Sequence, residues 1–553
     1  AQVLTAYDAL SRPVKVWAKE QPSDLYTLRQ VSKYAENELG ITAAKEKNIV
    51  GQLYQHFDEA GLNQIERCDY KGNPLEKVKQ VISDATLLAS GTTSYTVDWT
   101  NSPSILDSTE YRTTIEYDAL NRGTKLTLPK DINNHRAVIE PVFNTAGALE
   151  RIKKDNVEYV KHIAYNAKGQ QLLVVWKNDI MMRFAYDEQT FRLKRVKAER
   201  YTIDNVNPNQ YNYNSGNTRY DQSYVHDLVG NILEVKDRTP DCGISGSTAV
   251  LDRMFEYDAI YRLIYANGRE MNTQGEGFLF ADAPEIGNAT ASNCRYYEQD
   301  YEYDKVGNIQ KLRHRVIGNT SLYYTRNFIY NTSNNQHTQI NNNQTTPTVY
   351  STFTYDAVGN MLTSNADRFY TWDTFGSLKN FELKAGGTTS RFAHYLYDAS
   401  GTRVKKIVIN DQGKYESVTY IDGVLELHTR NTSGTLEQKN YLHLMGGIEQ
   451  RIGSYGDDIS DALIYHITDH LGSAAIRLDG SGAIIDKEEY YPYGDSSLRT
   501  FTKRRFRYIG KERDEESGLY QMGARYYAPW TCKFLSVDPL AVKLAHQSSY
   551  CYA

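Results

Sequence analysis

Short runs of alternating apolar and polar residues, each ended by a turn, recur along most of the chain. Residues 309–316 are an example, and the segments around them follow the same plan. An alternation of this kind is the pattern of a β-strand with one buried face. Gly, Asn and Asp gather between the runs, where they favour tight turns. The pattern predicts an all-β protein built from hairpins.

An aromatic residue followed by Asp or Asn, and then by a turn residue, marks these turns. The pair occurs at Tyr7-Asp8, Phe57-Asp58, Tyr117-Asp118, Tyr165-Asn166, Tyr186-Asp187, His226-Asp227, Tyr257-Asp258, Tyr303-Asp304, Tyr330-Asn331, Tyr355-Asp356, Trp372-Asp373 and Tyr397-Asp398. In the middle of the chain the spacing is roughly 20–40 residues, the range that is typical of repeat architectures. Stacked repeats share one continuous core, so we expect one long β-structure rather than several globular domains.

Two variants of the turn suggest how it closes. In 303–309 and 355–361 a Gly-Asn pair follows the Asp, and Gly accepts the positive φ that a tight connection needs. In 7–12, 117–122 and 257–262 an Arg ends the turn instead, where we expect it to pair with the repeat Asp or with a backbone carbonyl. We interpret the repeat aspartates as turn caps, not as metal ligands or catalysts.

Three segments depart from the strand pattern. In residues 23–62, Leu25, Leu28, Val31 and Tyr34 have helical spacing after a possible Ser23-Asp24 cap. Ala43–Phe57 fits a second helix, although Val50–Tyr54 fits a strand equally well. Residues 204–219 and 331–349 are rich in polar residues and are predicted to be surface loops.

Composition narrows the function classes. The 553 residues include 45 Tyr, an amphipathic residue suited to a wall with one wet face, and carry a net charge of −5 with mixed signs. That balance argues against nucleic acid as the main partner, and no apolar run is long enough for a transmembrane helix. Five widely spaced cysteines fit neither a zinc site nor a disulfide framework, so we expect buried free thiols. Neither an initiator Met nor a signal peptide opens the sequence, which suggests an internal piece of a longer polypeptide.

A denser set of motifs begins near residue 464. It comprises 465–473 (YHITDHLGS), 490–494 (YYPYG), 508–520 (YIGKERDEESGLY), 523–530 (GARYYAPW) and 534–540 (FLSVDPL). Their order resembles the RHS-associated core of the RHS/YD-repeat family. Upstream, 48–54, 69–73 and 116–122 resemble bacterial toxins of the insecticidal toxin-complex type (the BC component, TcB/TcC) and SpvB-like RHS toxins. The chain has Cys532-Lys533-Phe534 where the family usually has Gly-Arg-Phe or Gly-Arg-Trp.

The resemblance implies a fold and a set of partners. YD-repeat hairpins (residues 1–463, with the possible helical insertion near 23–62) would form a long sheet that spirals into a hollow, cocoon-like shell. Residues 464–553 would form a C-terminal plug. The shell would enclose the protein's own C-terminal toxic effector, released extracellularly from a bacterium. Other implied partners are an N-terminal shell or β-propeller portion and delivery machinery such as a translocation channel or a secretion apparatus.

The resemblance also implies chemistry: at most a single-turnover aspartyl autoprotease that separates the effector from the shell, without cofactor or metal. Two carboxylates that share a proton would supply a base for water and an acid for the leaving group. The motifs point to Asp538, in Val537-Asp538-Pro539, and to Asp514, with Arg513 beside it to hold a carboxylate ionised. Otherwise Asp538 only starts a turn and Arg513-Asp514 is only a buried ion pair.

Alternative functions remain open at this point. A cell-surface adhesion scaffold of the teneurin-like YD-repeat type, without proteolysis, has the same repeats, and a glycan-binding β-solenoid is a third class. His466, Asp469 and His470 have a spacing that a metal ion could use, but their strand-rich setting favours structural packing.

Overall fold

The computed structural model describes residues 1–553 except 101–102, 205, 208–209, 245–246, 248, 273–290, 433, 457, 459–461, 502, 545–546 and 553. Within the described residues, β1–β36 belong to one antiparallel sheet, and β37–β40 form a separate four-stranded sheet. The all-β class and the long sheet built from hairpins are therefore confirmed.

The chain forms two compact units. Unit 1 comprises 1–159, 366–445 and 449–462, and unit 2 comprises 160–365, 446–448 and 463–553. These units group segments by contact and not by motif, so the division of the sequence into 1–463 and 464–553 stays a prediction.

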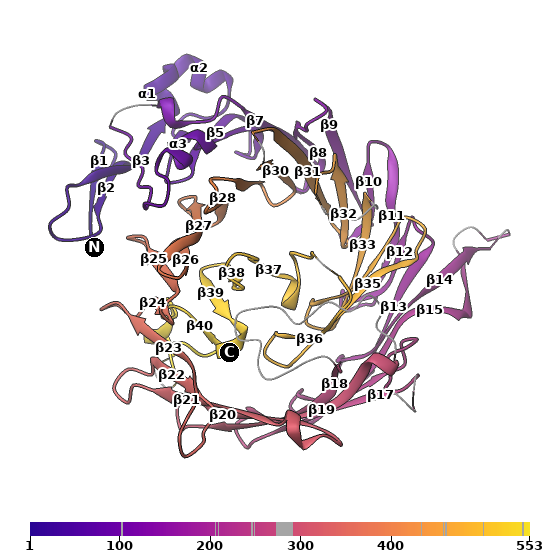
Figure 1. The fold of residues 1–553 in the computed structure, drawn as a ribbon. Helices are drawn as coiled ribbons and strands as arrows, with labels where there is room; N and C mark the ends of the chain where they lie inside the picture. The colour runs from indigo at the N-terminus through magenta and orange to yellow at the C-terminus, as the bar shows by residue number, and fades with distance from the viewer. Residues whose placement is uncertain are drawn as a thin grey trace. The chain divides into compact units, whose positions relative to one another are not determined.

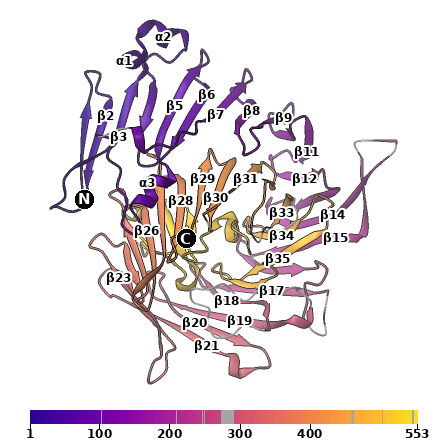
Figure 2. The same cartoon turned by 45° about the horizontal axis from the view of Figure 1, so that its top comes forward.

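Unit 1 contains two runs of neighbouring strands (Figures 1 and 2). The first is β1 (Gln2–Tyr7), β2 (Pro13–Lys19), β3 (Thr27–Tyr34), β4 (Leu53–Phe57), β5 (Gly61–Cys68), β6 (Pro74–Val81), β7 (Tyr111–Tyr117), β8 (Gly123–Lys130), β9 (Arg136–Phe143) and β10 (Leu149–Lys154). The second is β25 (Arg368–Trp372), β26 (Leu378–Ala385), β27 (Thr388–Tyr397), β28 (Arg403–Asn410), β29 (Tyr415–Ile421), β30 (Leu425–Asn431) and β31 (Leu436–Leu444), with β32 (Ile448–Ile452) after it. Leu28, Trp99 and Tyr111 pack with Ile407 and Leu425 in a core that joins the two runs.

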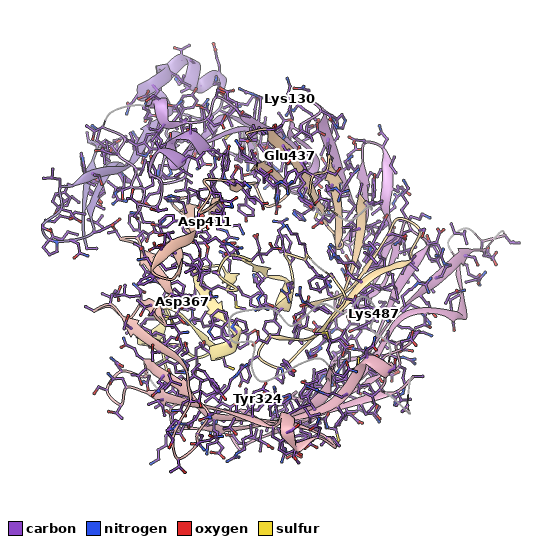
Figure 3. The ribbon with its side chains drawn as sticks, in the orientation of Figure 1. Lys130, Tyr324, Asp367, Asp411, Glu437 and Lys487 are labelled. Carbon is purple, nitrogen blue, oxygen red and sulfur yellow. The ribbon has the colours of Figure 1, made fainter. Side chains whose placement is uncertain are left out.

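Unit 2 holds a longer run of strands, preceded by β11 (Val157–Tyr165). The run is β12 (Gln171–Trp176), β13 (Ile180–Tyr186), β14 (Leu193–Ile203), β15 (Tyr211–His226), β16 (Ile232–Asp237), β17 (Leu251–Tyr257), β18 (Leu263–Met271), β19 (Cys294–Tyr303), β20 (Ile309–Val316), β21 (Tyr324–Tyr330), β22 (His337–Asn341), β23 (Val349–Tyr355) and β24 (Met361–Ser364). The C-terminal strands are β33 (Leu463–Thr468), β34 (Ala474–Leu478), β35 (Ile484–Tyr490), β36 (Ser496–Arg499), β37 (Glu512–Arg513), β38 (Tyr520–Met522), β39 (Arg525–Ala528) and β40 (Lys533–Phe534). Side chains project from both faces of the strands (Figure 3).

The α-helices among the described residues are few and short: α1 (Ala35–Leu39), α2 (Ile41–Glu46) and α3 (Asp84–Ala89). The predicted helix over Leu25–Tyr34 is wrong, because Thr27–Tyr34 forms β3 and pairs with β2 and β4. The second predicted helix is confined to α2, and its alternative, a strand, holds for β4. The predicted loop at 204–219 is wrong from Tyr211 onward, where β15 pairs with β14, and β22 interrupts the polar segment 331–349.

The repeat aspartate closes each turn as predicted. In the turn after β19, the Asp304 amide donates to the Asn308 carbonyl at 2.9 Å. Asp304 Oδ1 accepts from the amides of Val306 and Asn308, and Oδ2 accepts from Asn308 Nδ2. In the arginine variant the Arg side chain replaces the Asn, as Arg262 Nε donates to Asp258 Oδ2 at 2.6 Å. The Asp and the groups that it binds thus lie within five consecutive residues, which is why the turn can be recognised from the sequence.

The repeat tyrosine ties its hairpin to the one before it. The Tyr330 hydroxyl donates to the Ile309 carbonyl at 2.7 Å, and the Tyr303 hydroxyl donates to the Leu263 carbonyl at 2.6 Å. Tyr257 does the same to Ile232 at 3.1 Å. In each case the acceptor is the first residue of the preceding hairpin's second strand. The aromatic residue therefore acts between repeats, whereas the Asp acts within one.

Replacing Tyr330 by Phe tests this coupling. The hydroxyl is lost and the Ile309 carbonyl is left buried without its partner, so unfolding should cost about 1–2 kcal/mol less. Urea denaturation followed by circular dichroism measures the change. Tyr7→Phe is the control, because Tyr7 is 62 % exposed and its change should stay within about 0.5 kcal/mol. Equal losses in the two variants would show that the hydroxyl bond adds nothing.

Candidate functional site

The C-terminal motifs of unit 2 build a small sheet beside the repeat turns. Its strands β37 to β40 are antiparallel, and Arg513, Tyr520, Tyr527 and Phe534 lie in one row across it. Three hydroxyls of this region seat it on the 491–495 turn. Tyr508, Tyr527 and Tyr520 donate to the consecutive carbonyls of residues 492, 493 and 494, at 2.9, 2.8 and 3.1 Å. The motif tyrosines therefore position the sheet.

Asp538 lies just after β40 and is half-buried. Its Oδ2 is 2.7 Å from a guanidinium nitrogen of Arg525, and that guanidinium stacks on the Phe534 ring at 3.6 Å from the centroid. Asp538 Oδ1 accepts from the Leu540 amide at 2.7 Å. The carboxylate thus caps a turn and is also oriented by an arginine.

Asp514 and Arg513 lie at the start of the turn that joins β37 to β38. Asp514 is fully buried, and its carbonyl accepts from the Gly518 amide at 2.7 Å. Arg513 Nε donates to the Gly518 carbonyl at 3.0 Å, and another guanidinium nitrogen lies 3.6 Å from Asp495 Oδ1. Arg513 therefore braces the turn that carries Asp514 and reaches a third carboxylate, which the motifs alone did not single out.

The strand register sets the two predicted carboxylates apart. Asp514 lies one row beyond the row of Arg513 and Tyr520, whereas Arg525, the partner of Asp538, pairs with Met522 two rows away in the other direction. At about 3.3 Å per residue, these three rows set the backbones of Asp514 and Arg525 roughly 10 Å apart along the strands. The structure thus gives each carboxylate its own surroundings, and their catalytic pairing stays a prediction.

The departure at Cys532-Lys533 has a structural role. Cys532 adopts φ 55° and ψ 30°, the left-handed region in which glycine costs least, so the family's usual Gly suits this position. Lys533 is buried, hydrogen-bonds Asn308 of a repeat turn and lies 4.5 Å above the Tyr330 ring. Burial lowers the pKa of Lys533 to about 8. The residue fastens the small sheet to the repeats.

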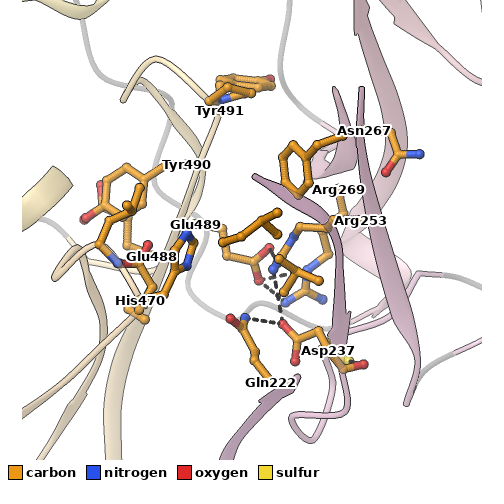
Figure 4. A pocket seen from close by; sticks show the side chains of 18 of the residues that line it. Gln222, Asp237, Arg253, Asn267, Arg269, His470, Glu488, Glu489, Tyr490 and Tyr491 are labelled. Carbon is orange, nitrogen blue, oxygen red and sulfur yellow. Dashed lines mark hydrogen bonds and ion pairs between the residues drawn. The ribbon is translucent and has the colours of Figure 1, made fainter. Parts of the chain in front are cut away.

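Behind these motifs lies a cavity of about 400 Å³, which we call the Tyr508 cavity. One side comes from β15–β19 and the other from residues 469–492 and Tyr508. Figure 4 shows side chains from both sides, among them Asp237 and Arg253 opposite His470 and Tyr490. Ile232, Val235, Leu263, Ile476 and Tyr490 line it. Its walls are therefore mostly apolar and aromatic, and they come from two segments far apart in the sequence, 220–297 and 469–508.

Four alternating charges cross one end of the cavity. Arg253 lies 2.6 Å from Glu489 and 3.4 Å from Asp237, and Arg269 Nε donates to Glu489 at 3.0 Å. Gln222 donates to Asp237 at 2.8 Å. Burial alone raises the pKa of Glu489, but Arg269 and Arg253 outweigh it and lower the pKa to about 2. The carboxylate is thus held ionised inside the protein.

The structure bears on three other expectations. Among the described residues no group of three or more His, Cys, Asp or Glu side chains could hold a metal ion. The His470 ring instead packs against the Tyr224 ring, tilted by 59° with centroids 5.0 Å apart. Cys68, Cys242, Cys294 and Cys532 are free and buried as expected, but Cys551 is only half-buried. The part of the chain that the structure describes has no helix long and apolar enough to span a membrane.

Comparison with known proteins gives a consistent result. No family model matches the chain. Toxin subunit YenC2 of Yersinia entomophaga is 28 % identical over 521 residues, which cover 90 % of this chain and 52 % of that protein. The chain is similar to bacterial toxin subunits along most of its length. It spans about half the length of the curated relatives YenC2 and YenC1.

The chain is also similar to a protein of another kind and to a solved structure. The tRNA nuclease WapA of Bacillus subtilis is 29 % identical over 252 residues, covering 43 % of this chain and 10 % of WapA. The crystal structure of TcdB2-TccC3 superposes with a TM-score of 0.84 at 24 % identity, covering the whole chain and 26 % of that structure. This superposition shows the fold, and the predicted resemblance to toxin-complex proteins is confirmed by the curated relatives.

Proposed function

We propose that the chain is part of a shell that encloses a toxic C-terminal segment and cuts it free. Similarity along 90 % of the chain to toxin subunit YenC2 is the observation that carries this proposal. The fold of TcdB2-TccC3 supports it, and TccC3 also occurs in a Tc holotoxin pore of Photorhabdus luminescens. Another structure of TcdB2-TccC3 lacks its hypervariable C-terminal region, which fits a variable segment placed after a constant shell.

The unpaired edges of a long β-sheet favour a closed shell. A long sheet leaves unpaired strand edges that invite aggregation, and a sheet that spirals closed protects them. In this proposal an N-terminal shell or β-propeller portion completes the wall, and a translocation channel or secretion apparatus delivers the cargo from a bacterium to its target.

Protease protection tests enclosure. In the natural full-length chain, residues far beyond 553 should resist a protease that digests them readily in a chain unfolded by urea. Equal digestion rates in the two conditions would contradict enclosure.

The proposed cut is hydrolysis of a peptide bond beyond residue 553. One carboxylate takes a proton from water as the resulting hydroxide attacks the peptide carbonyl, and the second carboxyl gives a proton to the departing nitrogen. Asp538, oriented by Arg525, is our first candidate for the base, with Asp514 as the second carboxyl. Arg513 is the positioning residue for the turn that carries Asp514.

Asp538→Asn tests the cut. An amide keeps one oxygen to cap the Leu540 amide, so the fold should persist, while self-cleavage should slow by about 100-fold or more. Gel electrophoresis of the natural full-length chain measures the fraction cut over time. Asp411→Asn in an exposed turn is the control. Cleavage of the Asp538 variant at the parental rate would remove Asp538 from the mechanism, and Asp514→Asn applies the same criterion to its partner.

A further inference from the structure

The Tyr508 cavity is not used by the proposed cleavage chemistry. Neither Asp538 nor Asp514 lines it. At about 400 Å³ it falls within the size of pockets that bind ligands, roughly 300–1,000 Å³. A cavity of this size can therefore hold a bound group or segment that the cleavage chemistry does not account for.

The lining indicates an uncharged, largely apolar occupant. Ile232, Leu263 and Ile476 are aliphatic, and Phe255, Tyr297 and Tyr490 supply ring faces. The four charges at one end are two acids and two bases paired with each other. The other charged lining residues also have partners: Glu488 pairs with Arg507, Lys487 donates to the Pro240 carbonyl, and Asp469 accepts from two turn amides. The charges of the lining are thus engaged within the protein and leave little attraction for a free ion. An apolar or aromatic side chain gains from leaving water here, whereas a charged one would have to be desolvated without compensation.

The described chain ends at the edge of this cavity. Tyr552 packs with its ring centroid 6.1 Å from that of Tyr508, and Tyr508 lines the cavity. Asp469, which also lines it, is close enough to raise the pKa of Tyr552, after the larger effect of burial. Tyr527 and Phe534 hold the other sides of the Tyr552 ring, at 5.0 and 6.1 Å. An extended chain advances about 3.3 Å per residue, so only a few residues separate position 552 from the cavity.

We propose that the Tyr508 cavity holds the first residues of the polypeptide that follows position 553, bound in an extended form with at least one apolar or aromatic side chain inside. The cavity would then anchor the near end of the enclosed segment to the wall. This inference rests on the proposed function, because it needs a segment that continues beyond the plug.

Photo-crosslinking tests the occupant directly. In the natural full-length chain, a photoreactive benzoylphenylalanine at Leu263, which faces the cavity, should crosslink to a peptide from about the first ten residues after 553. Mass spectrometry of the digested product identifies the peptide. The matched control is the same amino acid at Ile264, whose side chain lies on the opposite face of β18 and should give no such product. A crosslink from position 263 to any other segment, or none, overturns the inference.

Filling the cavity gives a second measurement. Ala475 lines it, so Ala475→Trp should displace the segment and raise the rate of protease cleavage within the first ten residues after 553 about tenfold or more. Ile484→Trp, at a 37 % exposed position of β35, is the control and should leave that rate unchanged. An unchanged rate in a folded Ala475→Trp protein overturns the inference.

The experiments distinguish a failure of the cavity anchor from a failure of the enclosure. Protection of the distal cargo without a crosslink from position 263 would remove the cavity anchor and keep the enclosure. Rapid digestion of the distal cargo in the parental chain would remove the enclosure itself. A crosslink together with distal protection supports both.

Discussion

Glu489→Gln is expected to lower the free energy of unfolding of unit 2 by about 3–5 kcal/mol, because it leaves Arg253 and Arg269 buried without their shared carboxylate. Urea denaturation at pH 7 measures this loss. Glu116→Gln is the control, since the Glu116 side chain is 67 % exposed and pairs only with a surface lysine. A loss below 1 kcal/mol for Glu489→Gln would show that the buried charges do not depend on one another.

Acid titration provides an independent check on the same residue. The pKa of Glu489 is about 2 in the folded protein and 4.5 ordinarily, so the unfolded chain binds the proton first as pH falls. Its stabilising contribution, about 3 kcal/mol, is complete above pH 4.5 and is lost as pH falls from about 4.5 through about 2. The difference in stability between parent and Glu489→Gln should therefore shrink over that window. A difference that is constant from pH 6 to 2 would contradict the ion-pair account.

Gly359→Ala is expected to release the C-terminal segment that contains Val537 and Tyr550. A Cβ at this position would lie 2.5 Å from the Tyr550 hydroxyl and 2.7 Å from a Val537 methyl carbon. The Tyr550 hydroxyl donates to the Gly359 carbonyl at 2.7 Å, so the clash falls on the contact that holds the segment to a repeat turn. Overpacking of this kind costs about 1–3 kcal/mol. Protease cleavage within the segment should rise about tenfold, measured by mass spectrometry of timed digests.

Gly401→Ala separates the clash from backbone strain. Gly401 occupies the same place in the Asp398 turn, with φ +79° against +95° at Gly359, but nothing lies within 4 Å of its Cβ position. Gly401→Ala should lower the free energy of unfolding by about 1–2 kcal/mol, the cost of an alanine in the left-handed region, without freeing the C-terminal segment. Equal cleavage in the two variants would show that strain, and not the contact with Tyr550, is responsible.

Turn chemistry could be predicted from the sequence because it is local. Asp304 finds its backbone and side-chain partners within four residues, so the identity of the repeat predicts the geometry. The pairing of Arg262 with Asp258 follows from the same short range. The repeat tyrosine has no such local partner. Its hydroxyl bond to a backbone carbonyl depends on how hairpins stack.

Secondary structure predicted from the local residue pattern was wrong where strand pairing or packing against distant residues determines the conformation. Leu28 and Tyr34 have helical spacing, yet Leu28 packs with Trp99 and Ile407, and the backbone pairs with two strands. Residues 211–219 are polar but form β15, since ladder hydrogen bonds with β14 require no apolar side chain.

The candidate site was located only in part. The motifs pointed to Asp538, Asp514 and Arg513, whose catalytic role stays a prediction, but not to Arg525 or Asp495, which contact two of them. The Tyr508 cavity was missed because its two sides come from residues 220–297 and 469–508. One feature of the sequence could have pointed to the cavity. Glu489 stands just before the aromatic motif 490–494, and an acidic side chain that is buried beside aromatic residues needs charged or hydrogen-bonding partners.

The tyrosine bonds between successive hairpins have a mechanical consequence. Each of these hydrogen bonds reaches only to the hairpin immediately before it, so successive hairpins are joined by a series of similar bonds. A pulling force applied at one end should break these bonds one after another. The force–extension curve should then show small, regularly spaced peaks, while the hairpins that the force has not yet reached stay folded.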